Sequence, residues 1–193
     1  MEYDKDKKEI RINKILNELD KFVIDFLKVL EKHVDYVVIS GYVSILLGRS
    51  RATEDIDVFI KNISFEKFFG LYNELKKKDY WCLNAEDPAE IFSYLKDGLA
   101  IRFSKGMMPI PNFEIKFPKR EIDKETFNDF ITVIHHYGNI KISSLERHIA
   151  FKRYFLKSDK DIEDALHIEE LFKGKIDYNK INKLKQIIDN LRD

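Results

Sequence analysis

The stretch Tyr36-Val-Val-Ile-Ser-Gly-Tyr-Val-Ser-Ile-Leu-Leu-Gly-Arg-Ser-Arg-Ala-Thr-Glu-Asp-Ile-Asp-Val-Phe-Ile60 decides the fold of this chain. It predicts a short apolar strand, a tight turn at Ser40-Gly41, one short apolar helix closed by Gly48, and a second strand that begins at Asp55. Side chains at positions i and i+2 of a strand share a face, so Asp55 and Asp57 point together. Two adjacent carboxylates repel each other, and a divalent cation between them is the usual solution. The stretch therefore predicts a site for metal and phosphate.

The composition predicts one compact domain, or one domain with a helical appendage. The chain has 193 residues, 44% of them hydrophobic, and its 34 basic and 34 acidic side chains cancel, so any nucleic-acid contact must be a local patch. A single cysteine, Cys82, excludes an internal disulfide and suits a reducing, cytoplasmic environment. The charged start Met1–Glu9 is unlike a signal peptide, and no apolar run approaches the roughly 20 residues that cross a bilayer. We expect no membrane partner.

Periodicity predicts helices around a small mixed sheet, an α/β (α+β) fold. Apolar residues three and four apart from about Asp6 to Lys32 predict one amphipathic helix across the core. We expect a core over residues 1–120, including that helix, and a mainly helical region over 121–193 that closes one side of a cleft. The other predicted elements are a helix over 65–77, a strand over 80–83, a helix over 88–95, strands over 99–104 and 112–117, a hairpin of 131–135 with 140–143, and helices from 144 past 155, over 160–172 and over 179–191.

A third acid follows in a later strand. Glu114 lies in the middle of the strand predicted over 112–117, with its two apolar neighbours on the opposite face. Adjacent strands that carry three carboxylates beside a glycine turn suit two-metal nucleotidyl transfer, since the turn can bring backbone N–H groups to a phosphate chain. The alternative is an ordinary exposed Glu114, paired with Lys116 or with Arg102 of a neighbouring strand.

The same residues carry a family resemblance. Ser40-Gly41 followed by Arg51-x-Thr53-x-Asp55-Ile-Asp57-Val-Phe resembles the signature of the minimal, DNA-polymerase-β-like nucleotidyltransferase superfamily. More narrowly, it is similar to the branch that includes the AbiEii-type toxins of type IV toxin–antitoxin systems. The turn departs from the usual Gly-Gly or Gly-Ser by placing the bulky Tyr42 after Ser40-Gly41. We expect this turn to decide whether a nucleoside triphosphate fits.

The resemblance extends into the second half of the chain. The segment from Ile140 to Lys152 is similar to the part of those proteins where a short strand feeds a helix that carries a lysine. Lys160-Asp161-Ile-Glu-Asp164 resembles their Lys-Asp-x-x-Asp stretch. Asp161 would either support Lys152 or face a partner. The matching pieces together span residues 36–171.

The resemblance implies a nucleotidyltransferase fold and a set of site residues. Catalysis and metal binding fall to Asp55, Asp57 and Glu114, which would hold two Mg²⁺ ions, with Mn²⁺ as an alternative. One ion would activate the attacking hydroxyl and the other would stabilise the leaving pyrophosphate. The residues implied in nucleotide and phosphate binding are Ser40, Gly41, Arg51, Thr53 and Lys152.

The implied reaction moves a nucleoside monophosphate from a nucleoside triphosphate to an acceptor hydroxyl. The 3′ end of tRNA is the first acceptor that the branch implies, and another RNA or a protein hydroxyl is the next. A cognate antitoxin would be the protein partner. The rival hypothesis is a catalytically weak module that binds a nucleotide or a partner within a toxin–antitoxin pair.

Two other patterns each have two interpretations. The run Lys76-Lys77-Lys78 suits either an RNA-binding patch or the solvated end of a helix, where cations complement the dipole. Tyr80 and Trp81 could stack on a base, but core packing is the better interpretation.

Overall fold

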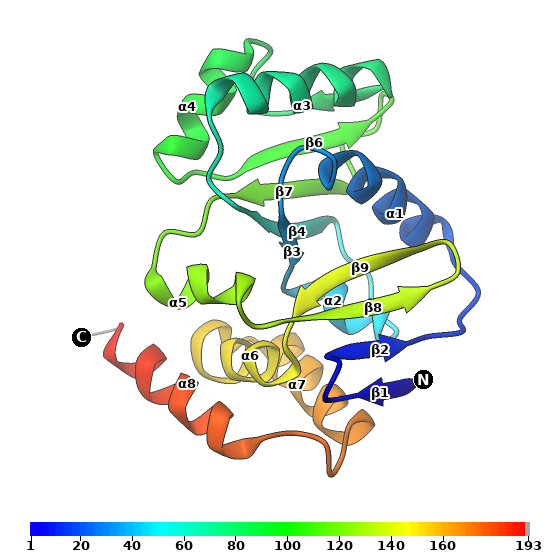
Figure 1. Ribbon diagram of the computed structural model, residues 1–193, viewed down its shortest axis with the longest axis vertical. Coiled ribbons are helices and arrows are strands. Elements are labelled where there is room, and N and C mark those ends of the chain that lie inside the picture. The colour runs from blue at the N-terminus through cyan, green and yellow to red at the C-terminus, as the bar shows by residue number, and fades with distance from the viewer. Residues whose placement is uncertain (192–193) are drawn as a thin grey trace.

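One mixed β-sheet organises the protein in the computed structural model, which describes residues 1–191 (Figure 1). Across these residues the strand order is β1-β2-β8-β9-β3-β4-β7-β6-β5. The strands are β1 (Glu2–Asp4), β2 (Glu9–Arg11), β3 (Tyr36–Val38), β4 (Asp55–Ile60), β5 (Tyr80–Cys82), β6 (Ile101–Lys105), β7 (Asn112–Lys116), β8 (Phe130–His135) and β9 (Gly138–Ser143). At its centre β4 pairs antiparallel with β3 and parallel with β7.

Two groups of helices lie at opposite ends of the molecule. Figure 1 shows α3 and α4 beside the β5 end, and α6, α7 and α8 together at the other end of the molecule. The helices are α1 (Glu18–Leu30), α2 (Gly41–Leu46), α3 (Phe65–Lys77), α4 (Pro88–Lys96), α5 (Glu121–Lys124), α6 (Leu145–Ala150), α7 (Asp159–Leu171) and α8 (Tyr178–Asn190), with a 3₁₀ turn at Glu125–Phe127 and a π-helical turn at Phe151–Leu156. None of the helices within residues 1–191 is both long and apolar enough to cross a membrane.

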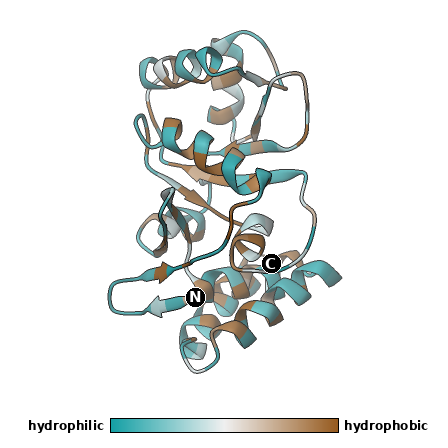
Figure 2. Ribbon diagram, turned by 90° about the vertical axis from the view of Figure 1, so that its right-hand side faces the viewer, coloured by the Kyte–Doolittle hydropathy of each residue, from teal (hydrophilic) through white to brown (hydrophobic). Residues whose placement is uncertain are grey.

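One part of the core lies between α1 and one face of the sheet. Ile56 and Val58 of β4 are fully buried, and Phe26 of α1 stacks on Phe113 of β7 with ring centroids 3.8 Å apart. Acidic residues of β4 and β7 alternate with buried apolar ones, and Figure 2 colours the hydrophobic segments of the ribbon brown and the hydrophilic ones teal. Because this face is filled by apolar side chains, the alternating acidic residues of β4 and β7 must point to the other face.

The prediction of one helix from about Asp6 to Lys32 is wrong in its first half. Residues 9–11 instead form β2, which pairs in parallel with β8 and buries Ile10 completely. Helix α1 starts only at Glu18, because Asn17 accepts a hydrogen bond from the backbone of Asp20 and Asp20 caps Asn17 in return. The apolar residues before Asn17 therefore form no buried helical face, and Ile15 is 96% exposed.

The predicted hairpin joins the same sheet as the preceding strands. β8 and β9 pair antiparallel, and β9 also pairs in parallel with β3. The chain after residue 120 therefore contributes two central strands as well as α5 to α8. The division into a core over 1–120 and a region over 121–193 stays a prediction, and residues 192–193 lie outside the described part.

Candidate active site

Three acidic residues lie on one face of β4 and β7. The parallel register places Asp57 directly beside Glu114, and Asp55 beside Asn112. The side chains of Asp57 and Glu114 are 19% and 17% exposed. Burial raises the pKa of Asp55, and the neighbouring charges of Asp57 and Glu114 raise it further. The three carboxylates therefore share one electrostatic environment.

Two cations pair with two of these acids, Asp57 and Glu114. The Lys116 Nζ lies 3.1 Å from Asp57 Oδ1 and 3.4 Å from Glu114 Oε1. The Arg102 Nη2 donates to Glu114 Oε2 at 2.8 Å. Burial alone would lower the pKa of Lys116, but Asp57 and then Glu114 raise it above its usual value. Both pairings that the sequence offered as alternatives for Glu114 are thus present.

The three carboxylates are ligands of the right kind for a divalent ion, but their present arrangement forms no metal site. Mg²⁺ prefers carboxylate oxygens, and the three acids share one face. Even so, no group of three or more His, Cys, Asp or Glu side chains within residues 1–191 is arranged to hold a metal ion. Asp57 and Glu114 instead both contact the Lys116 ammonium. Asp55, Asp57 and Glu114 are thus ligands of the kind that Mg²⁺ prefers, held in an arrangement that forms no metal site.

The turn after β3 is strained and tightly packed. Ser40 has φ 61° and ψ −142°, a conformation that favours glycine. A Cβ on Gly41 would lie 3.0 Å from Arg51 Nη2, so a side chain there would push the guanidinium back by a few tenths of an ångström. Tyr42 points away from the turn, is fully buried, and donates its hydroxyl hydrogen to Asp20 Oδ1 at 2.9 Å. Its ring therefore does not obstruct the space in front of Ser40.

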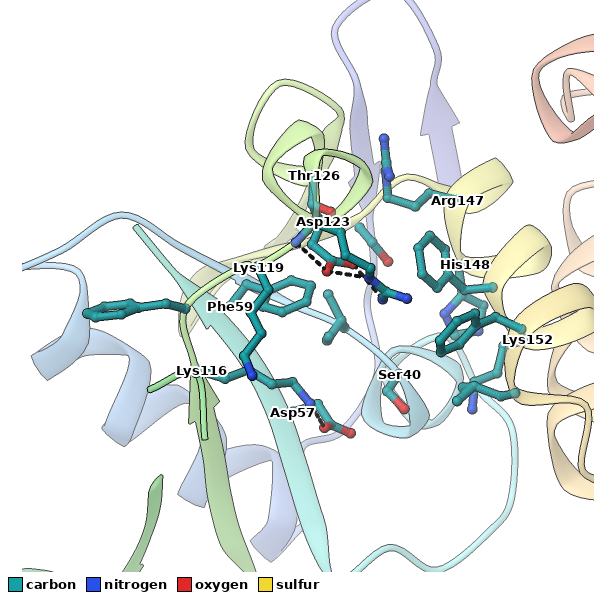
Figure 3. Close-up of a pocket in the computed structure, with 18 residues that line it drawn as sticks. Ser40, Asp57, Phe59, Lys116, Lys119, Asp123, Thr126, Arg147, His148 and Lys152 are labelled. Carbon is teal, nitrogen blue, oxygen red and sulfur yellow. Dashed lines mark hydrogen bonds and ion pairs between the residues drawn. The ribbon is translucent and has the colours of Figure 1, made fainter. Parts of the chain in front are cut away.

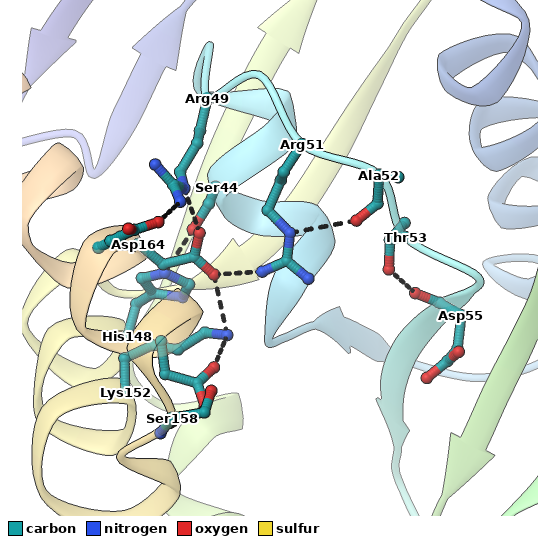
Figure 4. A network of polar contacts seen from close by, with 12 residues as sticks. Ser44, Arg49, Arg51, Ala52, Thr53, Asp55, His148, Lys152, Ser158 and Asp164 are labelled. Carbon is teal, nitrogen blue, oxygen red and sulfur yellow. Dashed lines mark hydrogen bonds and ion pairs between the residues drawn. The ribbon is translucent and has the colours of Figure 1, made fainter.

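A buried carboxylate gathers the basic residues behind the turn (Figure 4). Asp164 is completely buried and accepts hydrogen bonds from Arg49 Nε at 2.7 Å and Arg51 Nη1 at 2.5 Å. Lys152 Nζ lies 3.0 Å from Asp164 Oδ2 and donates to Asp161 Oδ1 at 2.6 Å. Asp161 thus pairs with Lys152, the contact expected from the sequence. Arg49 was missed, although it lies two residues before Arg51 in the same basic loop.

A cavity of about 370 Å³ opens beside Asp57 (Figure 3). Of the predicted site residues, Ser40, Asp57 and Lys152 line it, whereas Asp55, Glu114, Gly41, Arg51 and Thr53 do not. Thr53 instead donates its hydroxyl hydrogen to the backbone carbonyl of Asp55 at 2.9 Å. The polar and charged lining residues that sequence reasoning left out are Lys116, Lys119, Arg120, Asp123, Thr126, Ser143, Arg147 and His148.

Basic and aromatic side chains share the cavity wall. Arg120 places its guanidinium 4.5 Å from the ring centroid of Phe155, a cation–π distance. Arg147 donates to the backbone carbonyl of Ile122 at 2.7 Å, which links α6 to α5. The signal that could have found part of this wall is the basic pair Lys119-Arg120 just after the third acidic strand. Anionic, partly aromatic ligands suit such a wall.

His148 lies at the back of the cavity in a neutral state. Its Nε2 is 2.9 Å from Ser44 Oγ on α2, and both side chains are buried. Burial lowers the pKa of His148 to about 3, with the Lys152 charge as the next cause. The imidazole therefore joins α6 to α2 as an uncharged group at neutral pH.

Known structures share this architecture. No protein-family model and no curated protein matches the chain. Among solved structures, an antigenic nucleotidyltransferase-like protein from Paracoccidioides brasiliensis superposes with a TM-score of 0.55 at 18% identity, over 89% of this chain and 85% of that one. The chain has a nucleotidyltransferase fold.

Two structures of ANT(2'')-Ia show the same nucleotidyltransferase fold. The solution structure of this antibiotic-resistance factor has a TM-score of 0.56 at 13% identity, over 91% of this chain and 95% of that one. Its crystal structure in complex with adenylyl-2''-tobramycin has a TM-score of 0.51 at 11% identity, over 90% and 98%. At these identities the likeness concerns the architecture of the chain.

Proposed function

We propose that this protein transfers a nucleoside monophosphate from a nucleoside triphosphate to an acceptor hydroxyl and releases pyrophosphate. The observation that carries this proposal is the register of β4 on β7, which sets Asp55, Asp57 and Glu114 on one face beside a basic cavity. The nucleotidyltransferase fold supports it, and so does the sequence signature from Ser40 to Asp57.

Each group has a role in this reaction. Asp55, Asp57 and Glu114 would bind Mg²⁺, and the bound ion would supply positive charge to the triphosphate and the attacking oxygen. Glu114 can also accept the proton of the acceptor hydroxyl as a general base. Ser40 and Lys152 line the cavity and would contact phosphate oxygens, while Gly41, Arg51 and Thr53 shape the loop behind them.

The acceptor that we place first is the 3′ end of tRNA, followed by another RNA or a protein hydroxyl. Its support is the resemblance of residues 160–164 to the Lys-Asp-x-x-Asp stretch of the AbiEii-type branch, together with the ion pairs that this stretch makes to Lys152. The same resemblance supports a role in a cytoplasmic toxin–antitoxin pair with a cognate antitoxin as partner.

One observation favours a second function, a catalytically weak nucleotide-binding or partner-binding module. Lys116 bridges Asp57 and Glu114 through the oxygens that a metal would need. An ammonium that stayed there during substrate binding would leave the cavity able to bind phosphates but unable to activate an acceptor.

Labelling with nucleoside triphosphates tests both functions. The protein is incubated with each α-labelled nucleoside triphosphate, Mg²⁺ and total tRNA or cell extract, beside Asp55→Ala and Asp57→Ala. The matched control is Asp6→Ala, because Asp6 is an exposed aspartate outside the sheet. Incorporation that both site variants lose and the control keeps supports the transferase.

The second function has a different outcome in the same assay. Mg²⁺-dependent binding of a nucleotide without incorporation in any extract supports the binding module. Incorporation that survives in Asp55→Ala and Asp57→Ala would contradict the assignment of this site.

A further inference from the structure

A second pocket lies on the opposite face of the sheet from the three acids. Its volume is about 280 Å³, and it is lined by Asp25, Lys28, Lys78, Tyr80 and Lys105. These residues belong to α1, the end of α3, β5 and the end of β6. Tyr80 pairs with Lys105 in the register of β5 on β6. On the same strand β6, Arg102 pairs with Glu114. Lys105 is three residues from Arg102, and residues an odd number apart in a strand point to opposite faces. The second pocket therefore lies on the other face from the acids.

Tyr80 lines this pocket, and its buried hydroxyl lacks a hydrogen-bond partner within residues 1–191. Tyr80 is 2% exposed, and its hydroxyl makes no hydrogen bond to any of the described residues. Its ring is held in place by an edge-to-face contact with Phe26, with ring centroids 5.0 Å apart. Burial and then the Asp25 charge raise the pKa of Tyr80, so the hydroxyl stays protonated and can donate. Most buried polar groups have a hydrogen-bond partner, so an acceptor is expected beside the Tyr80 hydroxyl.

The net positive charge of the pocket favours an anionic acceptor. Three ammonium groups, from Lys28, Lys78 and Lys105, face one carboxylate, from Asp25. Asp25 Oδ2 forms an ion pair with the Lys105 Nζ at 4.0 Å, and the same ammonium lies 5.2 Å from the centroid of the Tyr80 ring. One acid against three lysines leaves the pocket with a net positive charge. Lys78 also ends the basic run 76–78, which extends the positive surface along α3.

We propose that this pocket binds a phosphate group, with the Tyr80 hydroxyl donating to a phosphate oxygen and the three lysines supplying the charge. The phosphate can come from a free ion or from a polynucleotide backbone. Trp81 is the next residue of the same edge strand, points to the other face and is 42% exposed. A polynucleotide that crosses this edge meets a stacking surface on one side and the phosphate pocket on the other. The inference is independent of the transferase reaction.

The protein carries its own reporter for the test. Trp81 is the only tryptophan of the chain, so its fluorescence reports on this edge of the sheet. Wild type is titrated with inorganic phosphate and, separately, with a single-stranded oligouridylate, both in the presence of EDTA. We expect a saturable change in fluorescence with a phosphate-bearing ligand. In Tyr80→Phe we expect about tenfold weaker binding, because one charge-assisted hydrogen bond is lost.

Three other variants separate this site from the rest of the molecule. Lys105→Gln should also weaken binding, whereas Lys183→Gln, an exposed lysine of α8, should not. Asp57→Asn should bind as wild type does, which distinguishes this pocket from the acidic face. Tyr80→Phe removes only an unpartnered hydroxyl, so its melting temperature should not fall, and that measurement confirms folding.

The outcomes identify the source of the phosphate. Saturable binding of inorganic phosphate alone supports a free anion, and binding of the oligouridylate supports a polynucleotide backbone, provided that Tyr80→Phe and Lys105→Gln weaken it. No saturable change with either ligand would overturn the proposal. So would a change that is undiminished in both of these variants.

Discussion

Replacing Lys116 by methionine tests whether an ammonium and a divalent ion compete for the same oxygens. The change keeps the aliphatic stem and removes the charge that lies 3.1 Å from Asp57 Oδ1 and 3.4 Å from Glu114 Oε1. The three side chains are 17% to 28% exposed, so solvent screens the two ion pairs only in part. Loss of the pairs, at up to about 1 kcal/mol each, and the repulsion left between the acids should lower the free energy of unfolding by about 1.5 kcal/mol.

The free energy of the Lys116 ion pairs should also change the affinity for Mg²⁺. A Mg²⁺ ion that binds wild type must first displace Lys116, whereas in Lys116→Met the carboxylates are free. A difference of about 1.4 kcal/mol corresponds to about tenfold tighter Mg²⁺ binding in the variant. At a Mg²⁺ concentration ten times its dissociation constant, the variant should gain about 1.4 kcal/mol of stability.

Urea unfolding in EDTA and over a series of Mg²⁺ concentrations measures both quantities. Lys119→Met is the matched control, because Lys119 lines the same cavity and has no carboxylate partner among the described ion pairs. The expected result is a loss of stability in EDTA that Mg²⁺ restores in Lys116→Met alone. Equal stabilisation of wild type, variant and control by Mg²⁺ would refute the competition.

Three further residues in and behind the cavity wall, His148, Asp164 and Ser40, are tested by substitution. In the unfolded chain His148 takes up a proton below about pH 6.5, whereas in the folded protein its pKa is about 3. This difference should lower the free energy of unfolding of wild type by about 2 kcal/mol between pH 7 and pH 5. His148→Gln should lack that slope in urea unfolding at each pH. Asp164→Asn should lower the free energy of unfolding by about 3 kcal/mol, because buried cations lose their carboxylate. Its control, Glu163→Gln, should lower it by less than about 0.5 kcal/mol, since the Glu163 side chain is 61% exposed. Ser40→Gly should raise the melting temperature, with a gain of about 1 kcal/mol from relieved strain at φ 61°, and Ser40→Ala should not.

Local rules predicted most of the elements and the acidic face. Helices α3 and α4 begin where Ser64 and Asp87 cap them, as their sequences indicate. Alternation along one strand sufficed to place Asp55 and Asp57 together, because it depends on residues two apart. The position of Glu114 on the same face followed from the alternation of its own strand.

Local rules failed where a distant partner decided the outcome. Residues 9–11 became a strand because β8 offered its edge, more than 100 residues further along the chain. The pattern of Ile12, Ile15 and Leu16 could not reveal this, since helical spacing and a short strand followed by a loop share the same few apolar positions.

The sequence by itself determined the strand–turn–helix–strand unit and the face that carries the acids, because these depend on neighbours within a few residues. Only the tertiary structure decided what surrounds them. It turned Tyr42 towards Asp20, and it brought Asp164 to Arg51 across 113 positions of the chain. It also brought Asp57 of β4 to Lys116 of β7. Such contacts depend on sheet topology and register, which no local pattern encodes.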